Sequence, residues 1–142
     1  MILVDEFKII MNQIPTATLQ ESRSTYNPKL KRIQVYEPTS VKKAKRDYYF
    51  ALLPHAPTKP IPGAKKVEIC FCFGTKNKKL KGKLKTSRPD VDNMAKILLD
   101  RMTKLGYWKD DSEVSRLDVM KRYVSEGESP NVKISIWRME ND

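Results

Sequence analysis

Acidic side chains gather in two short segments of the C-terminal half of the chain. Asp90 and Asp92 are followed by Lys96, and the pair Asp110–Asp111 comes further along. Carboxylate oxygens are ligands that Mg²⁺ prefers, and this ion usually takes only one or two of them from a protein, with water and phosphate oxygens completing its shell. A metal held in this way polarises a phosphodiester and activates a water molecule. The residue types therefore indicate metal-dependent phosphodiester hydrolysis as one candidate chemistry.

The same residues also have a structural explanation. Asp90 and Asp92 stand where a helix is expected to begin, and the unpaired backbone N–H groups and the helix dipole favour negative charge there. Lys96 lies four residues after Asp92, on the same helical face, so the two can form an exposed salt pair worth about 0.3–0.5 kcal/mol. The spacing alone leaves both explanations open.

A strongly basic segment directly precedes the first carboxylates. Residues 74–88 contain seven Lys or Arg and no acid, and we expect them to form a mobile loop. Cations beside a carboxylate cluster suit a nuclease, because the cations hold the phosphate backbone and the acids hold the metal that cuts it. Binding of this kind depends strongly on salt and little on base sequence. The predicted DNA-binding residues are Lys76, Lys78, Lys79, Lys81, Lys83, Lys85 and Arg88.

The charge of the whole chain favours a nucleic-acid partner. The 142 residues carry a formal net charge of +11, and residues 28–88, with seventeen Lys or Arg against three Asp or Glu, carry +14. No apolar stretch approaches the roughly 20 residues of a membrane span. Asp5, Glu6 and Lys8 stand where the apolar core of a signal peptide would lie. We therefore expect a cytoplasmic protein with no membrane partner.

Periodicity predicts an α+β fold, as a single domain over residues 1–142 with a mixed sheet and two principal helices. Alternating polar and apolar residues predict strands, over 6–14, 32–36, 65–73, 114–124 and 132–139. Apolar residues at helical spacing predict helices, over 39–53 and 91–105.

The connections between these elements carry further expectations. Residues 15–28 are polar without periodicity and should form a loop. The last two strands flank a turn with Gly127 and Pro130, so we expect them to form an antiparallel hairpin. Gly106 ends the second helix, and the turn there is expected to let Asp110 or Asp111 approach the first carboxylate pair.

The two acidic segments resemble the signature of a known family, the RusA Holliday-junction resolvases. The first block reads Arg88-Pro89-Asp90-Val91-Asp92-Asn93-Met94-x-Lys96-x-x-x-Asp100, and the second reads Gly106-Tyr107-Trp108-x-Asp110-Asp111-Ser112-x-Val114. A lone Asp-x-Asp would be weak, but the two blocks at this separation are specific.

This resemblance implies a homodimer that uses Mg²⁺, or Mn²⁺, to make paired symmetric nicks in four-way DNA junctions. Matching positions imply that Asp90, Asp92 and Asp111 are the essential carboxylates that hold the metal. The resemblance places the catalytic lysine at Lys96. Asp110 matches the first acid of the second pair as a supporting residue. Asn93 is a second supporting position, which we expect to orient a carboxylate by hydrogen bonding.

Two other functions fit the sequence. One is a nuclease that acts on other branched or hybrid substrates, such as forks, flaps or RNA hybrids. The other is a non-catalytic, basic nucleic-acid-binding module, in which the acids are only a helix N-terminus and a turn; EDTA would leave its activity intact. Tyr107 and Trp108 are expected to pack against the sheet, and His55 is expected to be exposed and not catalytic.

Overall fold

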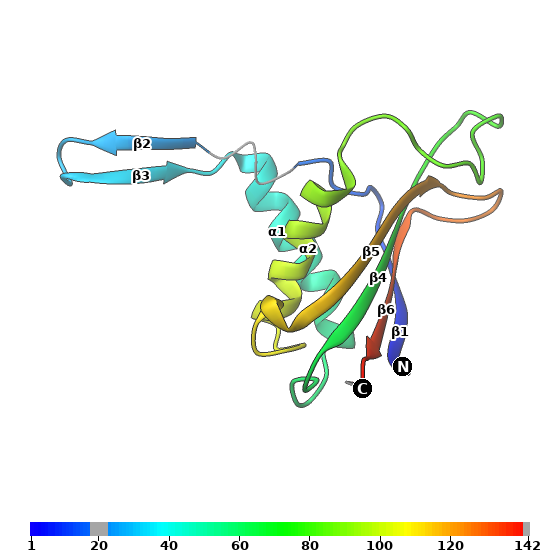
Figure 1. The fold of residues 1–142 in the computed structure, drawn as a ribbon. Helices are drawn as coiled ribbons and strands as arrows, with labels where there is room; N and C mark the ends of the chain where they lie inside the picture. The colour runs from blue at the N-terminus through cyan, green and yellow to red at the C-terminus, as the bar shows by residue number, and fades with distance from the viewer. Residues whose placement is uncertain (18–22, 141–142) are drawn as a thin grey trace.

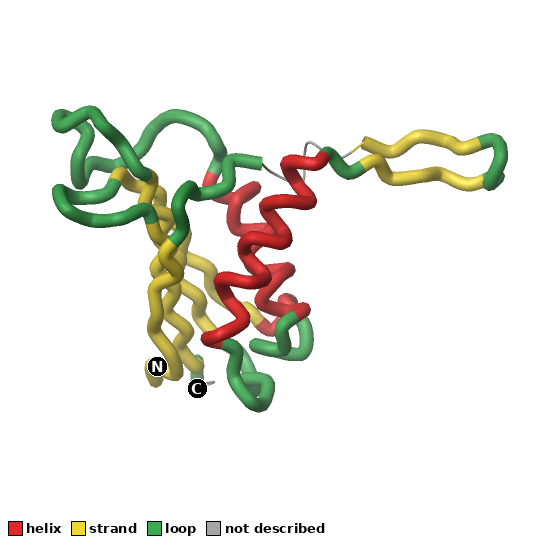
Figure 2. Tube along the Cα trace, turned by 180° about the vertical axis from the view of Figure 1, so that it is seen from behind, coloured by secondary structure: helices red, strands yellow, loops and turns green. Residues whose placement is uncertain are grey.

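The computed structural model describes residues 1–17 and 23–140 and contains two helices and a mixed sheet (Figure 1). Both helices cover the same face of a four-stranded sheet, and a two-stranded hairpin projects away from this body (Figures 1 and 2). The predicted α+β class with two principal helices is confirmed. Within the described ranges, neither helix is long and apolar enough to cross a membrane. The strands are β1 (Ile2–Ile10), β2 (Arg23–Asn27), β3 (Arg32–Tyr36), β4 (Lys65–Phe73), β5 (Val114–Tyr123) and β6 (Asn131–Arg138); the helices are α1 (Thr39–Leu52), α2 (Val91–Lys104) and the short 3₁₀ turns η2 (Leu53–His55) and η3 (Asp111–Glu113).

The core lies between the helices and the inner face of the sheet. Apolar residues recur every three or four positions along each helix and every second position along β4 and β6, which gives each element one apolar face. Burying one large apolar side chain contributes about 1.5–3 kcal/mol to the stability of the folded state. Tyr107 and Trp108, which follow α2, are buried in this core as predicted. Further core residues include Tyr48 and Leu52 of α1, Met94, Leu98 and Met102 of α2, Val67, Ile69 and Phe71 of β4, and Val132, Ile134 and Ile136 of β6.

The strand order of the sheet is β1-β6-β4-β5. β4 pairs with β5 in parallel, and β6 pairs antiparallel with both β4 and β1. The predicted hairpin of residues 114–124 with residues 132–139 is therefore wrong, because β4 lies between these two strands. Burial explains the order: β6 is apolar enough for an interior position, whereas β5 leaves Leu117 and Met120 40% and 47% exposed at the edge.

Two predicted boundaries near the N-terminus also differ. The first strand begins at Ile2 rather than at residue 6 and ends at Ile10, because it pairs with β6 over its whole length. The predicted loop at 15–28 contains β2, which pairs only with β3 among the described residues, while residues 18–22 of that loop lie outside the described part. β3 matches its predicted bounds of 32–36, whereas β2, with Tyr26 as its one apolar residue, carries no alternating pattern.

Candidate active site

The first predicted carboxylates lie at the N-terminal end of α2. Asp90 precedes the helix in an extended conformation, and its carbonyl oxygen accepts the first helical hydrogen bond from Met94 (3.2 Å). Asp90, Asp92 and Lys96 are exposed, and their side chains make no hydrogen bond or ion pair with the described part of the chain. The exposed Asp92–Lys96 salt pair of the structural explanation is thus not formed here. Solvent reaches the oxygens of both carboxylates.

Asn93 is the buried neighbour of these carboxylates. Its side chain is only 3% exposed, and its Oδ1 atom has no hydrogen-bond partner among the described residues. An unsatisfied buried amide oxygen is costly, so such a group calls for an explanation. That Asn93 orients a carboxylate stays a prediction.

The basic segment 74–88 is tied to the outer edge of β5. The backbone N–H of Gly82 donates to Val124 O (3.0 Å), that of Tyr123 to Lys83 O (2.9 Å), and that of Lys85 to Lys121 O (3.2 Å). These bonds extend the sheet by a short ladder and place the segment next to the start of α2. Its seven cationic side chains are exposed or half-buried. The mobility of this segment stays a prediction, but its anchor point is fixed by the ladder.

Lys121 of β5 is a residue that the sequence analysis missed. Its Nζ atom donates to the carbonyl oxygens of Ser87 (2.5 Å) and Pro89 (2.7 Å). Lys85 reaches the same stretch, since its Nζ donates to Ser87 Oγ (2.6 Å). Lys121 therefore holds the backbone that leads into Asp90, and Lys85 holds the side chain of Ser87. No sequence signal marks Lys121, because the contact spans 32 residues and depends on the strand order.

The second predicted acidic pair forms a turn at the other end of α2. Asp110 caps η3, with its Oδ1 accepting the N–H of Ser112 (2.9 Å), while Glu113 Oε1 accepts the N–H groups of Lys109 (3.1 Å) and Asp110 (3.3 Å). The pKa of Asp111 is raised, first by its hydrogen bond with Asp110 and then by partial desolvation. The pKa of Asp110 is lowered by the Ser112 N–H and by the same bond. The two carboxyls therefore titrate as a pair.

The two acidic segments do not meet within one chain. In Figure 1, α2 runs from its first turn at the upper end of the helix layer to the lower end, where β5 begins. Asp111 is close enough to Asp100 for the charge of Asp100 to contribute to the raised pKa of Asp111. Asp100 itself lies about 12 Å from Asp92 along the helix axis, at 1.5 Å per residue. Among residues 1–17 and 23–140, no three His, Cys, Asp or Glu side chains form a group that could hold a metal ion. The turn at Gly106 thus returns the chain to the wrong end of α2 for the expected approach.

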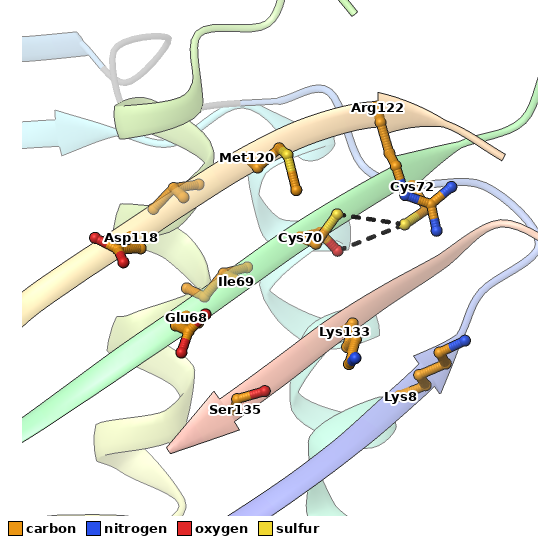
Figure 3. Close-up of a pocket in the computed structure, with 11 residues that line it drawn as sticks. Lys8, Glu68, Ile69, Cys70, Cys72, Asp118, Met120, Arg122, Lys133 and Ser135 are labelled. Carbon is orange, nitrogen blue, oxygen red and sulfur yellow. Dashed lines mark hydrogen bonds between the residues drawn. The ribbon is translucent and has the colours of Figure 1, made fainter. Parts of the chain in front are cut away.

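A hollow of about 540 Å³ lies on the opposite face of the sheet, away from all these residues (Figure 3). Lys8, Lys133 and Arg122 line it together with the free cysteines Cys70 and Cys72, whose sulfur atoms lie 3.6 Å apart. The hydrogen bond between the two thiols lowers the pKa of Cys70 to about 6. None of the predicted site residues borders this hollow, so it is distinct from the candidate site.

The sequence of the chain, including its two acidic segments, matches a known family of nucleases. The sequence model of the family described as "Endodeoxyribonuclease RusA" matches residues 15–137, which include every predicted site residue. The chain belongs to the RusA family.

Similar curated proteins carry the same family name. "Crossover junction endodeoxyribonuclease rusA" of Lactococcus phage r1t is 46% identical over 56 residues, which are 39% of this chain and 43% of that protein. The proteins of the same name from Escherichia coli strain K12 and Enterobacteria phage 82 are each 36% identical over 55 residues, or 39% of this chain and 44% of theirs. The matched segments therefore span less than half the length of these relatives.

Proposed function

We propose that the protein is a metal-dependent endodeoxyribonuclease that cuts branched DNA, preferably four-way junctions, by phosphodiester hydrolysis. One observation carries this proposal: two solvent-facing carboxylates, Asp90 and Asp92, stand at the start of α2 beside a basic segment anchored to β5. Membership of the RusA family and the names of the similar proteins support it. In this arrangement the cations bind the phosphate backbone and the carboxylates lie next to it.

The donor set at this end of α2 fits a hard divalent cation. Asp90 and Asp92 would hold Mg²⁺, or Mn²⁺, through exposed carboxylate oxygens, with Asp111 as the third ligand. When bound, the metal polarises the phosphodiester and supplies an activated water. Lys96, one turn beyond Asp92, would stabilise charge on the scissile phosphate, because its ammonium has no ion-pair partner among the described residues. Asn93 would orient one carboxylate by donating a hydrogen bond from its amide Nδ2 group.

A homodimer would bring the two separate acidic segments together. Asp111 lies at the opposite end of α2 from Asp90 and Asp92, so one chain alone does not assemble the three carboxylates. A two-fold arrangement, in which each chain offers the same patch to the other, would bring Asp111 of one chain to Asp90 and Asp92 of the second. Two such sites related by a two-fold axis also suit paired symmetric nicks in a four-way junction.

The projecting β2–β3 hairpin supplies a second DNA contact in this proposal (Figures 1 and 2). An isolated two-stranded hairpin is only marginally stable in water, and Tyr26 and Ile33 are 63% and 71% exposed on this one. Residues 23–36 contain four Lys or Arg and no acid. A two-stranded ribbon fits the major groove of a duplex. The positive charge of the hairpin therefore favours contact with one duplex arm of the junction.

Replacing Lys29, Lys31 and Arg32 at the hairpin tip with Gln tests this contact. Junction binding measured without metal should weaken. The slope of log K against log salt should become less steep by up to about 2.7, or about 0.9 for each lost phosphate contact. The melting temperature should not change, since the hairpin strands pair only with each other among the described residues. An unchanged slope would remove the hairpin from the DNA surface, and a change in molecular mass would assign it to the dimer interface.

Cleavage of matched substrates tests the proposed function itself. Labelled four-way junction, fork, flap and linear duplex are incubated with the purified protein in Mg²⁺, in Mn²⁺ and in EDTA. We expect paired nicks in the junction with either metal and none in EDTA. Faster cleavage of forks or flaps would reassign the substrate. Tight binding to junctions with no cleavage in any metal would favour the non-catalytic binding module.

A further inference from the structure

Lys65, the first residue of β4, is a buried cation. Its side chain is 0% exposed, its Nζ atom donates to Gly63 O (2.6 Å), and the same atom lies 3.4 Å from Glu113 Oε2. The ring of Trp108 lies beside it, with 5.8 Å from Nζ to the ring centre. Burying an ion pair is costly, and apolar side chains of similar volume often stabilise such positions equally well or better. Packing alone therefore does not explain a lysine here.

Glu113 connects this lysine to the acidic turn. One of its carboxylate oxygens faces Lys65, and the other accepts the N–H groups of Lys109 and Asp110. Asp110 in turn accepts the N–H of Ser112. A continuous set of polar contacts thus runs from the buried lysine to the turn that carries Asp111.

We infer that Lys65 is a positioning residue that, through Glu113, fixes the turn of Asp110 and Asp111 for the reaction. This inference rests on the proposed function. Lys65 is buried and touches no substrate, so its effect would pass entirely through the orientation of the Asp111 carboxylate. Orientation matters because a displacement of about 1 Å at a reacting group costs up to roughly 10²-fold in rate.

The test uses the paired variant Lys65→Met with Glu113→Gln in the full chain. Lys65→Met alone would leave Glu113 without its cation and could unfold the protein, whereas the paired variant removes both charges and keeps an acceptor oxygen at position 113. Glu128→Gln is the matched control, because Glu128 also pairs with a cation, Arg122, and caps a turn through the N–H of Ser125 (2.8 Å). That turn carries no predicted site residue.

Two readouts separate positioning from simple stabilisation. Without metal or DNA, the backbone amide order parameters of residues 109–112 should fall from about 0.85 toward 0.6 in the paired variant, while those of β4 and β6 stay unchanged. The Mg²⁺ concentration for half-maximal junction cleavage should rise by about tenfold or more, with unchanged DNA affinity in EDTA. Glu128→Gln should alter neither quantity.

An ordered turn in the paired variant would overturn the inference, and so would a disordered turn with an unchanged Mg²⁺ requirement. A wild-type protein that cleaves no junction would instead contradict the proposed function. In that case the order parameters alone would still decide whether Lys65 holds the turn.

Discussion

The two ends of α2 carry similar carboxylates in opposite settings. At the N-terminal end, Asp90 and Asp92 face solvent, and only the backbone around them is held, by Lys121. At the C-terminal end, Asp110 and Asp111 bond to each other and to the turn that they form. The first end leaves its oxygens accessible to a ligand from outside the chain, whereas the second end is ordered by the chain itself. Because the two ends are separated by the length of α2, a site that needs carboxylates from both ends is incomplete in one chain.

Mixed dimers give the strongest test of this comparison. Asp92→Asn and Asp111→Asn should each abolish cleavage, because each removes one carboxylate from both sites. After the two variants are mixed and allowed to exchange chains, half of the dimers are mixed, and each of these regains one complete site if the ends meet between chains. Single-strand nicking should then return to about a quarter of the wild-type rate.

The control for this experiment is a mixture of Asp90→Asn with Asp92→Asn. These residues belong to the same end of α2, so every mixed dimer retains a damaged pair at both sites and should stay inactive. No recovery in the first mixture, with chain exchange verified by mass, would show that the ends do not complete each other between chains.

Charge removal in the basic segment and on strands β1 and β6 should have unequal effects on DNA binding. Replacing Lys78, Lys79 and Lys81 of the basic segment with Gln should weaken junction binding by about tenfold or more and make the salt slope less steep by up to about 2.7. The matched variant removes three exposed cations of β1 and β6, at Lys8, Lys133 and Arg138, and should change binding far less. Fluorescence anisotropy over a range of salt concentrations measures both. Equal losses would mean that the basic segment has no special role in DNA binding.

Lys121→Met tests whether the backbone anchor at the N-terminal end matters. The variant loses the bonds to the carbonyl oxygens of Ser87 and Pro89, so the cleavage rate should fall about tenfold through misplacement of Asp90, with little change in junction affinity. Lys133→Met, which removes a surface ion pair with Glu6 (2.9 Å), is the control and should cleave normally. A Lys121→Met protein with wild-type turnover would contradict the anchoring role.

The smallest effect is expected from Asp110→Asn at the C-terminal end. The hydrogen bond with Asp110 is the main cause of the raised pKa of Asp111, so the substitution should lower that pKa toward its ordinary value. Asp111 would then lose its proton at a lower pH, and the acid limb of the cleavage profile should move in the same direction. Carbon-13 NMR titration of the Asp111 carboxyl measures the shift directly, and an unshifted titration would argue against a coupled pair.

The elements with a buried face could be predicted from the sequence. β4 matches its predicted bounds, and α2 ends one residue early, because apolar residues at fixed spacing mark a face that must be buried. β2 could not be found in this way, because Arg23–Asn27 has no alternation of polar and apolar residues. The pairing of the last two strands was mispredicted because closeness in sequence favours a hairpin, while the order of a sheet depends on which strands bury more apolar surface.

The candidate site shows the same limit. Motif spacing singled out Asp90, Asp92 and Asp111, and their roles stay predictions. Motif spacing does not determine the distance between Asp111, which follows the turn at Gly106, and the first carboxylate pair. Lys121 and Lys65 were not singled out, because a lysine on a strand carries no mark of a partner that is distant in sequence.

Cleavage of a synthetic four-way junction by Asp92→Asn tests the central claim most directly. Wild-type protein should nick the junction in Mg²⁺, and Asp92→Asn should nick it at least about 100-fold more slowly. Even substitution of residues that only support metal ligands lowers activity by roughly 10–100-fold. Asp118→Asn, which alters an exposed carboxylate on β5, should cleave normally, and junction binding in EDTA should persist in all three proteins. Equal nicking by wild type and Asp92→Asn would contradict the account.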